Sequence, residues 1–138
     1  MSHGMIYEGV NWFEIPVMDM DRAVAFYEAV FGIPMTVQTK GLIQMALWPK
    51  PKNPSGAGGS LIKVKGINPS HDGSLVYFTV KDIQPVLDKV LAHGGKILKE
   101  KMNIGEYGLI AHVADSEGNR VGIHQPAVGV HAACSYSS

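Results

Sequence analysis

The sequence predicts an α+β fold of two βαβββ modules, whose strands form a cupped eight-stranded mixed sheet with the helices outside. The first observation is a repeat. The segment NWFEIPVMDMDRAVAFYEAVFG, residues 11–32, recurs in its pattern of residue types as SLVYFTVKDIQPVLDKVLAHGG, residues 74–95, without a gap. The second is that each copy reads as a strand followed by a helix, and the third is that short apolar runs follow each copy. A repeat of this kind indicates a duplicated structural unit.

The first copy begins with a strand over residues 10–17, in which apolar and other side chains alternate. Alternation places Phe13 and Val17 under the helices and turns the opposite parity toward the concave face. A helix follows, with an apolar stripe on one face. Asp19 is its predicted N-cap and Gly32 ends it as a C-cap glycine.

The second copy follows the same plan. Asp82 is the predicted cap, Pro85 lies in the first turn where a missing N–H loses no partner, and the helix ends before Gly94. Three short strands are expected after each helix, near residues 34–40, 42–48 and 57–64 in the first module and 96–104, 108–114 and 120–125 in the second.

Length and composition indicate one domain over residues 6–126, with modules at 6–65 and 73–126 and flexible ends at 1–5 and 127–138. The formal net charge is zero, which argues against nucleic acid or an anionic membrane surface as a partner. No apolar run is long enough to span a membrane. A single cysteine, Cys134, allows no internal disulfide and favours a reducing, cytoplasmic location.

Three motifs carry a family resemblance: IPVMDMDRAVAFYEAVFG, TVKDIQPVLDKVLAHGG and HVADSEGNRVGIHQP. With these motifs the chain resembles the glyoxalase/bleomycin resistance/dioxygenase superfamily, also called vicinal oxygen chelate proteins. It is most similar to a glyoxalase-like group without an assigned reaction. The resemblance implies a homodimer that takes a small-molecule ligand or substrate.

The resemblance also implies where a divalent metal would be held, because enzymes of the family take His, Gln or Glu ligands from the first and last strands of each module. Carried over, these positions are Trp12, Leu75 and Gly122, and the repeat adds Gly59. None of these side chains coordinates a metal. The sequence therefore predicts no metal ligands and no cofactor, with a divalent metal held by other residues as the alternative.

A ring of four residues lies one step further along the same strands: Glu14, Leu61, Tyr77 and His124. Glu14 and His124 are the candidate catalytic pair, since a carboxylate and an imidazole across a pocket can act as general acid and base or fix a polar ligand. Trp12, Tyr77, Leu61 and Gly122 are candidate ligand-binding residues, and Trp12 either fills the space of a metal or stacks on a planar ligand.

His112 has an uncertain side-chain direction and is interpreted as structural. Three functions stay open: a metal-independent protein that binds a small molecule or uses Glu14 and His124 in catalysis, a metal-dependent lyase, isomerase or dioxygenase, and a structural or regulatory dimer with a filled pocket. The residues do not decide whether the protein is an enzyme, because one fold hosts many chemistries.

Overall fold

The structure is a computed structural model and describes residues 10–52 and 56–127. The first module contains β1(Trp12–Pro16), α1(Met20–Phe31), β2(Thr36–Lys40), β3(Ile43–Leu47) and β4(Gly58–Lys63). The second contains β5(Tyr77–Thr79), α2(Ile83–Ala92), β6(Lys96–Asn103), a one-turn 3-10 helix η1(Gly105–Tyr107), β7(Leu109–Ala114) and β8(Arg120–Gln125). Both modules thus have the predicted βαβββ order, and the α+β fold class is confirmed.

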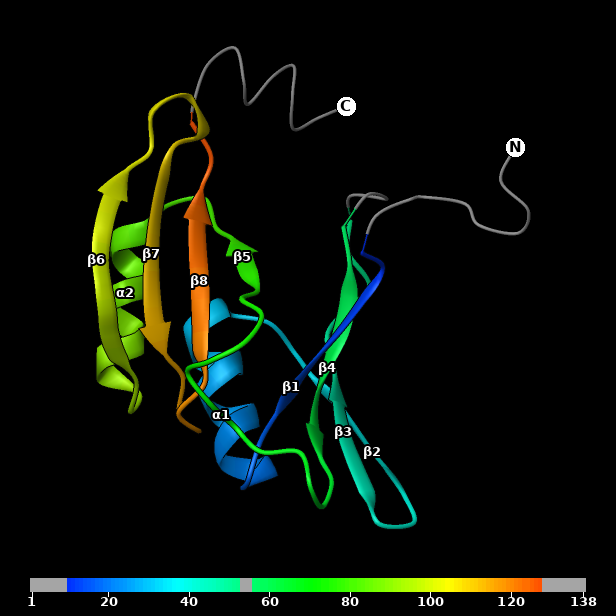
Figure 1. Cartoon of the computed structure of the whole chain (residues 1–138). Coiled ribbons are helices and arrows are strands. Elements are labelled where there is room, and N and C mark those ends of the chain that lie inside the picture. The colour runs from blue at the N-terminus through cyan, green and yellow to red at the C-terminus, as the bar shows by residue number, and fades with distance from the viewer. Residues whose placement is uncertain (1–9, 53–55, 128–138) are drawn as a thin grey trace.

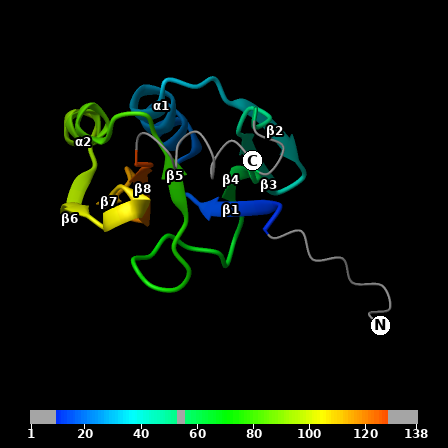
Figure 2. The same ribbon diagram turned by 90° about the horizontal axis from the view of Figure 1, so that it is seen from above.

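The strands form two four-stranded mixed sheets, with the orders β1-β4-β3-β2 and β5-β8-β7-β6. In each sheet the first strand of the module pairs in parallel with the last, and the other neighbours are antiparallel. The two sheets lie side by side, and both helices lie on the same side of them (Figures 1 and 2). The eight predicted strands are therefore present as two separate hydrogen-bonded sheets with the helices on one side, where the repeat suggested one continuous sheet.

The helix ends follow the capping residues only in part. The Asp19 carboxylate accepts a hydrogen bond from the Arg22 backbone N–H at 3.1 Å, and Gly32 closes α1 in the left-handed conformation with φ 66°. Asp82 precedes α2 without capping it through its side chain, and the Gln125 side chain accepts from the Ile83 N–H at 2.8 Å instead. The second helix start thus depends on the last strand of its own module.

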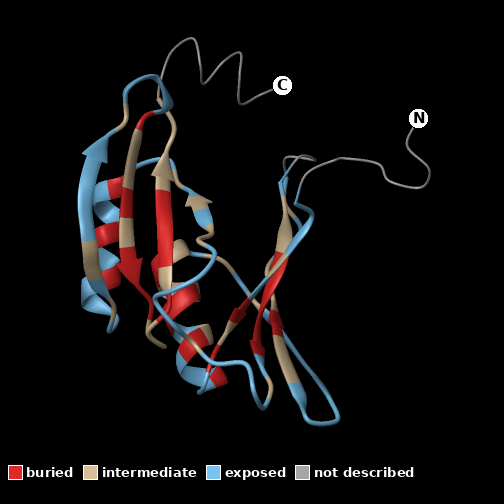
Figure 3. Cartoon of the chain, in the orientation of Figure 1, coloured by how far each residue is buried: buried red, intermediate tan, exposed pale blue. Residues whose placement is uncertain are grey.

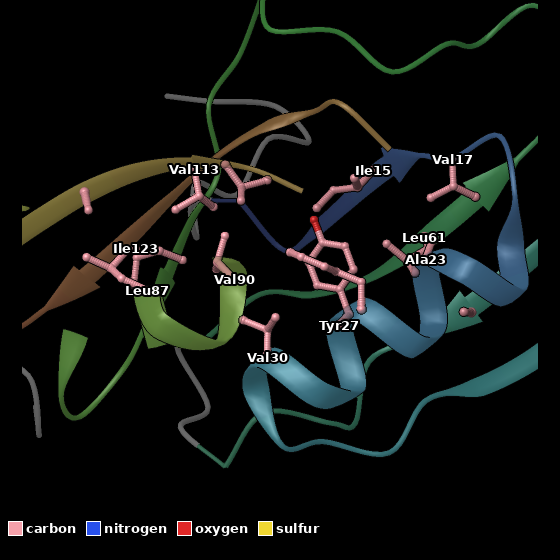
Figure 4. Close-up of a cluster of buried hydrophobic side chains, with 14 of the residues drawn as sticks. Ile15, Val17, Ala23, Tyr27, Val30, Leu61, Leu87, Val90, Val113 and Ile123 are labelled. Atoms are coloured by element: carbon pink, nitrogen blue, oxygen red, sulfur yellow. The ribbon is translucent and has the colours of Figure 1, made fainter. Parts of the chain in front are cut away.

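One hydrophobic core joins the two modules. Buried residues concentrate on the helices and on the central strands, as the colouring in Figure 3 shows. Figure 4 shows part of this core, where Tyr27 of α1 lies among residues of both modules. The rings of Phe13 and Phe78 meet edge to face at 5.7 Å, so equivalent strands of the repeat contact each other directly.

The turn between β7 and β8 fastens the second module to the first. The Glu117 carboxylate accepts hydrogen bonds from the Met18 and Asp19 N–H groups at 2.9 Å and pairs with Arg22 at 2.7 Å. Burial acts to raise the pKa of Glu117, but the hydrogen bonds from Arg22 and the two backbone groups outweigh it and lower that pKa to about 2.

A second carboxylate of this turn is buried beneath α1. Asp115 accepts a hydrogen bond from the Tyr27 hydroxyl at 2.7 Å, and Asn119 donates to both Asp115 and the Pro16 carbonyl. Burial, followed by the Asp115 charge, raises the pKa of Tyr27 well above its usual value.

Within the described ranges, 10–52 and 56–127, neither helix has the length and apolar content needed to cross a membrane. The flexible ends expected from the sequence lie almost entirely outside these ranges.

Candidate functional site

The face of the sheets opposite the helices, which the sequence predicted to be concave and which we call the concave face, carries the side chains of one parity on β1 and β5. Phe13, Ile15 and Phe78 belong to the core or pack against it, which turns the alternate residues of both strands the other way. Trp12 is 46% exposed and Tyr77 is 43% exposed. Glu14 is also exposed. These predicted concave residues are therefore accessible.

Strand pairing corrects the prediction for Leu61. Glu14 pairs with Ser60 in the first module, and its equivalent Tyr77 pairs with Gly122 in the second. Equivalent residues of the last strands, β4 and β8, are therefore separated by one residue fewer than equivalent residues of the first strands, β1 and β5. Ser60 rather than Gly59 is the counterpart of Gly122, and Leu61 turns into the core.

Leu61 has no exposed surface, and Figure 4 draws it in the core with Ala23 and Tyr27 of α1. It therefore does not line the concavity. The physical reason is the period of two along a strand, since a slip of one residue moves each side chain to the opposite face.

Gly122 permits a close approach of the Tyr77 ring. A Cβ atom at position 122 would lie 2.4 Å from Tyr77 Cδ1 and 2.5 Å from Cε1, closer than van der Waals contact allows. The ring occupies the space that a side chain on Gly122 would need. Gly122 is buried. Its part in the site is to accommodate Tyr77 rather than to contact a ligand with a side chain.

Across Gly122, Tyr77 reaches His112 on the next strand. Gly122 pairs with Tyr77 on one side and with His112 on the other, so the three residues form one row across the sheet. The Tyr77 hydroxyl lies 2.7 Å from His112 Nε2, and the two rings meet edge to face at 5.6 Å. Arg120 Nη1 lies 3.0 Å from His112 Nδ1. We call Tyr77, His112 and Arg120 the polar row.

Burial, followed by the charges of Arg120 and Lys99, lowers the pKa of His112. Lys99 pairs with His112 in the sheet, which explains its influence. His112 is therefore neutral at pH 7, since its ordinary value already lies below that.

Arg120 connects the polar row to a pocket between the modules. The pocket has a volume of about 170 Å³ and lies between β1, the linker of residues 68–76 and the start of β8. Its charged lining residues are Glu14, Asp72 and Arg120. A larger groove of about 510 Å³ runs beside the β2–β3 turn, but none of the polar row lines it. The smaller pocket is the candidate binding site because it brings charged groups of both modules together.

The proposed pairing of Glu14 with His124 is not observed among the described residues. His124 Nε2 lies 2.6 Å from the Tyr107 carbonyl oxygen, and His124 does not line the pocket that contains Glu14. His124 lies further along β8, beside Thr79, whereas Glu14 lies near Arg120 at the beginning of that strand. Glu14 and Tyr77 are retained as candidates, and the catalytic pair is not.

Arg120 was not among the residues predicted from the sequence, and His112 was interpreted as structural. One signal was available, because Gly122 has the concave parity and a glycine there leaves room between the neighbouring strands. It became interpretable only with the register, which aligns Tyr77 and His112 on either side of Gly122.

Residues 9–123 match the model of the glyoxalase/bleomycin resistance protein/dioxygenase superfamily. The chain belongs to this superfamily. A glyoxylase-like domain-containing protein of Didymella fabae is 29% identical over 120 residues, which are 83% of this chain and 92% of that protein. CFP32 of Mycobacterium tuberculosis, provisionally named a glyoxylase, is 24% identical over 131 residues and 83% of this chain. The match is 44% of CFP32, so the chain spans about half the length of that relative.

Solved structures of other proteins share the fold. A glyoxalase family protein from Bacillus cereus aligns with a TM-score of 0.69 at 16% identity, covering 93% of this chain and 99% of the other. An antibiotic-binding protein from Streptomyces sp. CB03234 aligns with a TM-score of 0.62 at 23% identity, covering 89% and 99%.

The residues at the superfamily's metal positions do not fit a divalent metal. With the corrected register these positions are Trp12, Ser60, Leu75 and Gly122, and only Ser60 has a side-chain oxygen. A catalytic zinc site takes about three good protein donors. Among the described residues, no group of three or more His, Cys, Asp or Glu side chains is placed to hold an ion.

Proposed function

We propose that this superfamily member binds a small molecule between its two modules without a divalent metal, through Trp12, Tyr77 and the polar groups around Arg120. The observation that supports this most directly is the Tyr77 ring lying over Gly122. The superfamily's fourth metal position is here occupied by an aromatic ring whose hydroxyl belongs to a polar row. A pocket with a few convergent polar groups is the usual form of a small-molecule site.

Binding is better supported than metal catalysis. A metal-dependent lyase, isomerase or dioxygenase needs donors that the positions of Trp12, Ser60, Leu75 and Gly122 do not offer. The antibiotic-binding relative from Streptomyces has the same fold, so this scaffold serves binding in at least one other protein. Tyr77 and His112 do not line the pocket and adjoin it only through Arg120, so a glyoxalase-like reaction that uses them needs a substrate that extends from the pocket over the polar row.

We also propose a homodimer and a cytoplasmic location. The dimer follows from the family resemblance, and the location from the single cysteine. Light scattering of the purified chain tests the first, and fractionation of the source cells tests the second.

The test of the proposed function begins with elemental analysis of protein purified without chelators. We expect less than about a tenth of a metal ion per chain, whereas a catalytic metal site would hold about one ion per chain. A thermal-shift screen of small molecules follows, in which Trp12→Ala should abolish the shift of any hit. One bound metal per chain, lost with a chelator together with stability, would contradict the proposal.

A further inference from the structure

The hydrogen bonds of the polar row have only one consistent direction. A guanidinium group has donors and no acceptor, so Arg120 must donate to His112 Nδ1. A neutral imidazole then has its single proton on Nε2, 2.7 Å from the Tyr77 hydroxyl. His112 therefore donates to the Tyr77 oxygen.

This direction leaves the Tyr77 hydroxyl proton for another acceptor. Among the described residues, no side chain or carbonyl other than His112 lies within hydrogen-bond distance of that hydroxyl. The side chain is 43% exposed, so the proton can meet a molecule that enters from the concave side. A preorganised donor of this kind selects an acceptor atom on its ligand.

On the strands of the polar row itself the neighbouring charged side chains are cationic, which favours a negatively charged acceptor at the Tyr77 hydroxyl. Arg120 contacts His112 directly, and Lys99 lies beside it on β6. Both are cationic, and both act on the His112 ring. The acidic groups in the vicinity, Glu14 and Asp72, line the pocket next to Arg120 and have no hydrogen bond to the polar row among the described residues.

We propose that the ligand is an organic carboxylate, whose oxygen accepts the Tyr77 proton while Arg120 and Lys99 supply the positive charge. This inference rests on the proposed function, because it names the chemical class of the molecule that the concave face binds. Charge-assisted hydrogen bonds are about twice as strong as neutral ones, so a neutral isostere should bind more weakly.

The first test needs no ligand. Nitrogen-15 NMR of histidine-labelled protein reports which ring nitrogen of His112 is protonated, and His112→Gln assigns the signal. We expect the neutral form with the proton on Nε2 at pH 7. A proton on Nδ1 would overturn the inference, because Nε2 would then accept the Tyr77 hydroxyl proton and leave none for a ligand. A cationic ring at pH 7 would also overturn it, because Nδ1 could then not accept from Arg120.

The second test is a panel of small aromatic and aliphatic carboxylates, each paired with its own primary amide, measured by ligand-observed NMR. We expect carboxylates to bind at least tenfold more tightly than their amides, about the ratio that 1.4 kcal/mol produces. Tyr77→Phe should weaken carboxylate binding by about three- to tenfold, the loss expected when one hydrogen bond of ordinary strength is removed, and Lys99→Gln should weaken it by a similar factor. Lys89→Gln removes the same charge from the exposed side of α2 and should leave binding unchanged.

The outcomes separate the two proposals. Equal binding of acids and amides, or binding of amides alone, overturns the carboxylate inference and leaves metal-free binding standing. Loss of affinity in Lys89→Gln equal to that in Lys99→Gln also overturns it, since the effect would then be nonspecific. No binding by any member of the panel, with one metal ion per chain, overturns both.

Discussion

Gly122→Ala is the substitution for which the structure makes the sharpest prediction. The new Cβ would meet three atoms of the Tyr77 ring at 2.4, 2.5 and 2.8 Å, and ring carbons cannot approach that closely. Tyr77 must move, and because it is 43% exposed it can swing toward solvent. The 2.7 Å hydrogen bond between Tyr77 and His112 is then lost.

The magnitude follows from three contributions. Overpacking costs about 1–3 kcal/mol, and this case falls near the lower limit because the ring can move outward. The lost hydrogen bond adds about 0.5–1.5 kcal/mol. Replacing a strand glycine by alanine returns about 0.5–1 kcal/mol of backbone entropy. We therefore expect a decrease of about 0.5–2 kcal/mol in the free energy of unfolding, to which the steric term and the lost hydrogen bond contribute comparably.

Urea denaturation followed by fluorescence measures this change, and NMR titration of His112 reports whether Tyr77 is still bonded to it. Gly58→Ala is the matched control. Gly58 likewise lies against an aromatic ring, that of Trp12 on β1, but its added Cβ would be 3.3 Å from the ring and so much less crowded. We expect less than about 0.5 kcal/mol for the control, the usual limit for a tolerated substitution. If Gly122→Ala is as stable as the wild type and His112 titrates as before, the close packing of Tyr77 on Gly122 is refuted.

Three further predictions concern the buried polar groups. The pKa of Glu117 in the folded protein is about 2. The ionised carboxylate therefore stabilises the fold fully above the ordinary pKa of a glutamate, and this stabilisation is lost as the pH falls toward 2. Because its partner Arg22 is 55% exposed, solvent screening limits the stabilisation to about 2 kcal/mol. Glu117→Gln should remove that acid-dependent part of the unfolding free energy, and an unchanged pH profile would contradict this origin. Tyr27→Phe leaves Asp115 with one donor fewer and should cost about 1.5–3 kcal/mol in urea denaturation, whereas a loss below 0.5 kcal/mol would show that the bond contributes little. The Ser60 hydroxyl is buried without a hydrogen-bond partner among the described residues, so Ser60→Ala should raise the melting temperature of the free protein, and a lower value would indicate a partner in solution.

Local sequence patterns were sufficient to predict the helices and strands and, for most strands, which face meets the helices. The alternation around Phe13 and Ile15 predicted which side of β1 meets the helices, and Asp19 and Gly32 predicted the ends of α1. These features depend on residues within a few positions of each other, so a sequence carries them completely. Trp12, Glu14 and Tyr77 were accordingly predicted on the correct face.

The register between distant strands was decided only by the tertiary structure. The strand pairing places Leu61 in the core and makes Ser60 the counterpart of Gly122, one residue away from the position that the repeat predicted. The same information brought His112 and Arg120 to Tyr77 and separated Glu14 from His124. The sequence by itself determined the duplicated fold and its two faces, because periodicity is local. Which polar side chains meet across the concave face depends on how strands far apart in the chain are aligned, and only folding fixes that alignment.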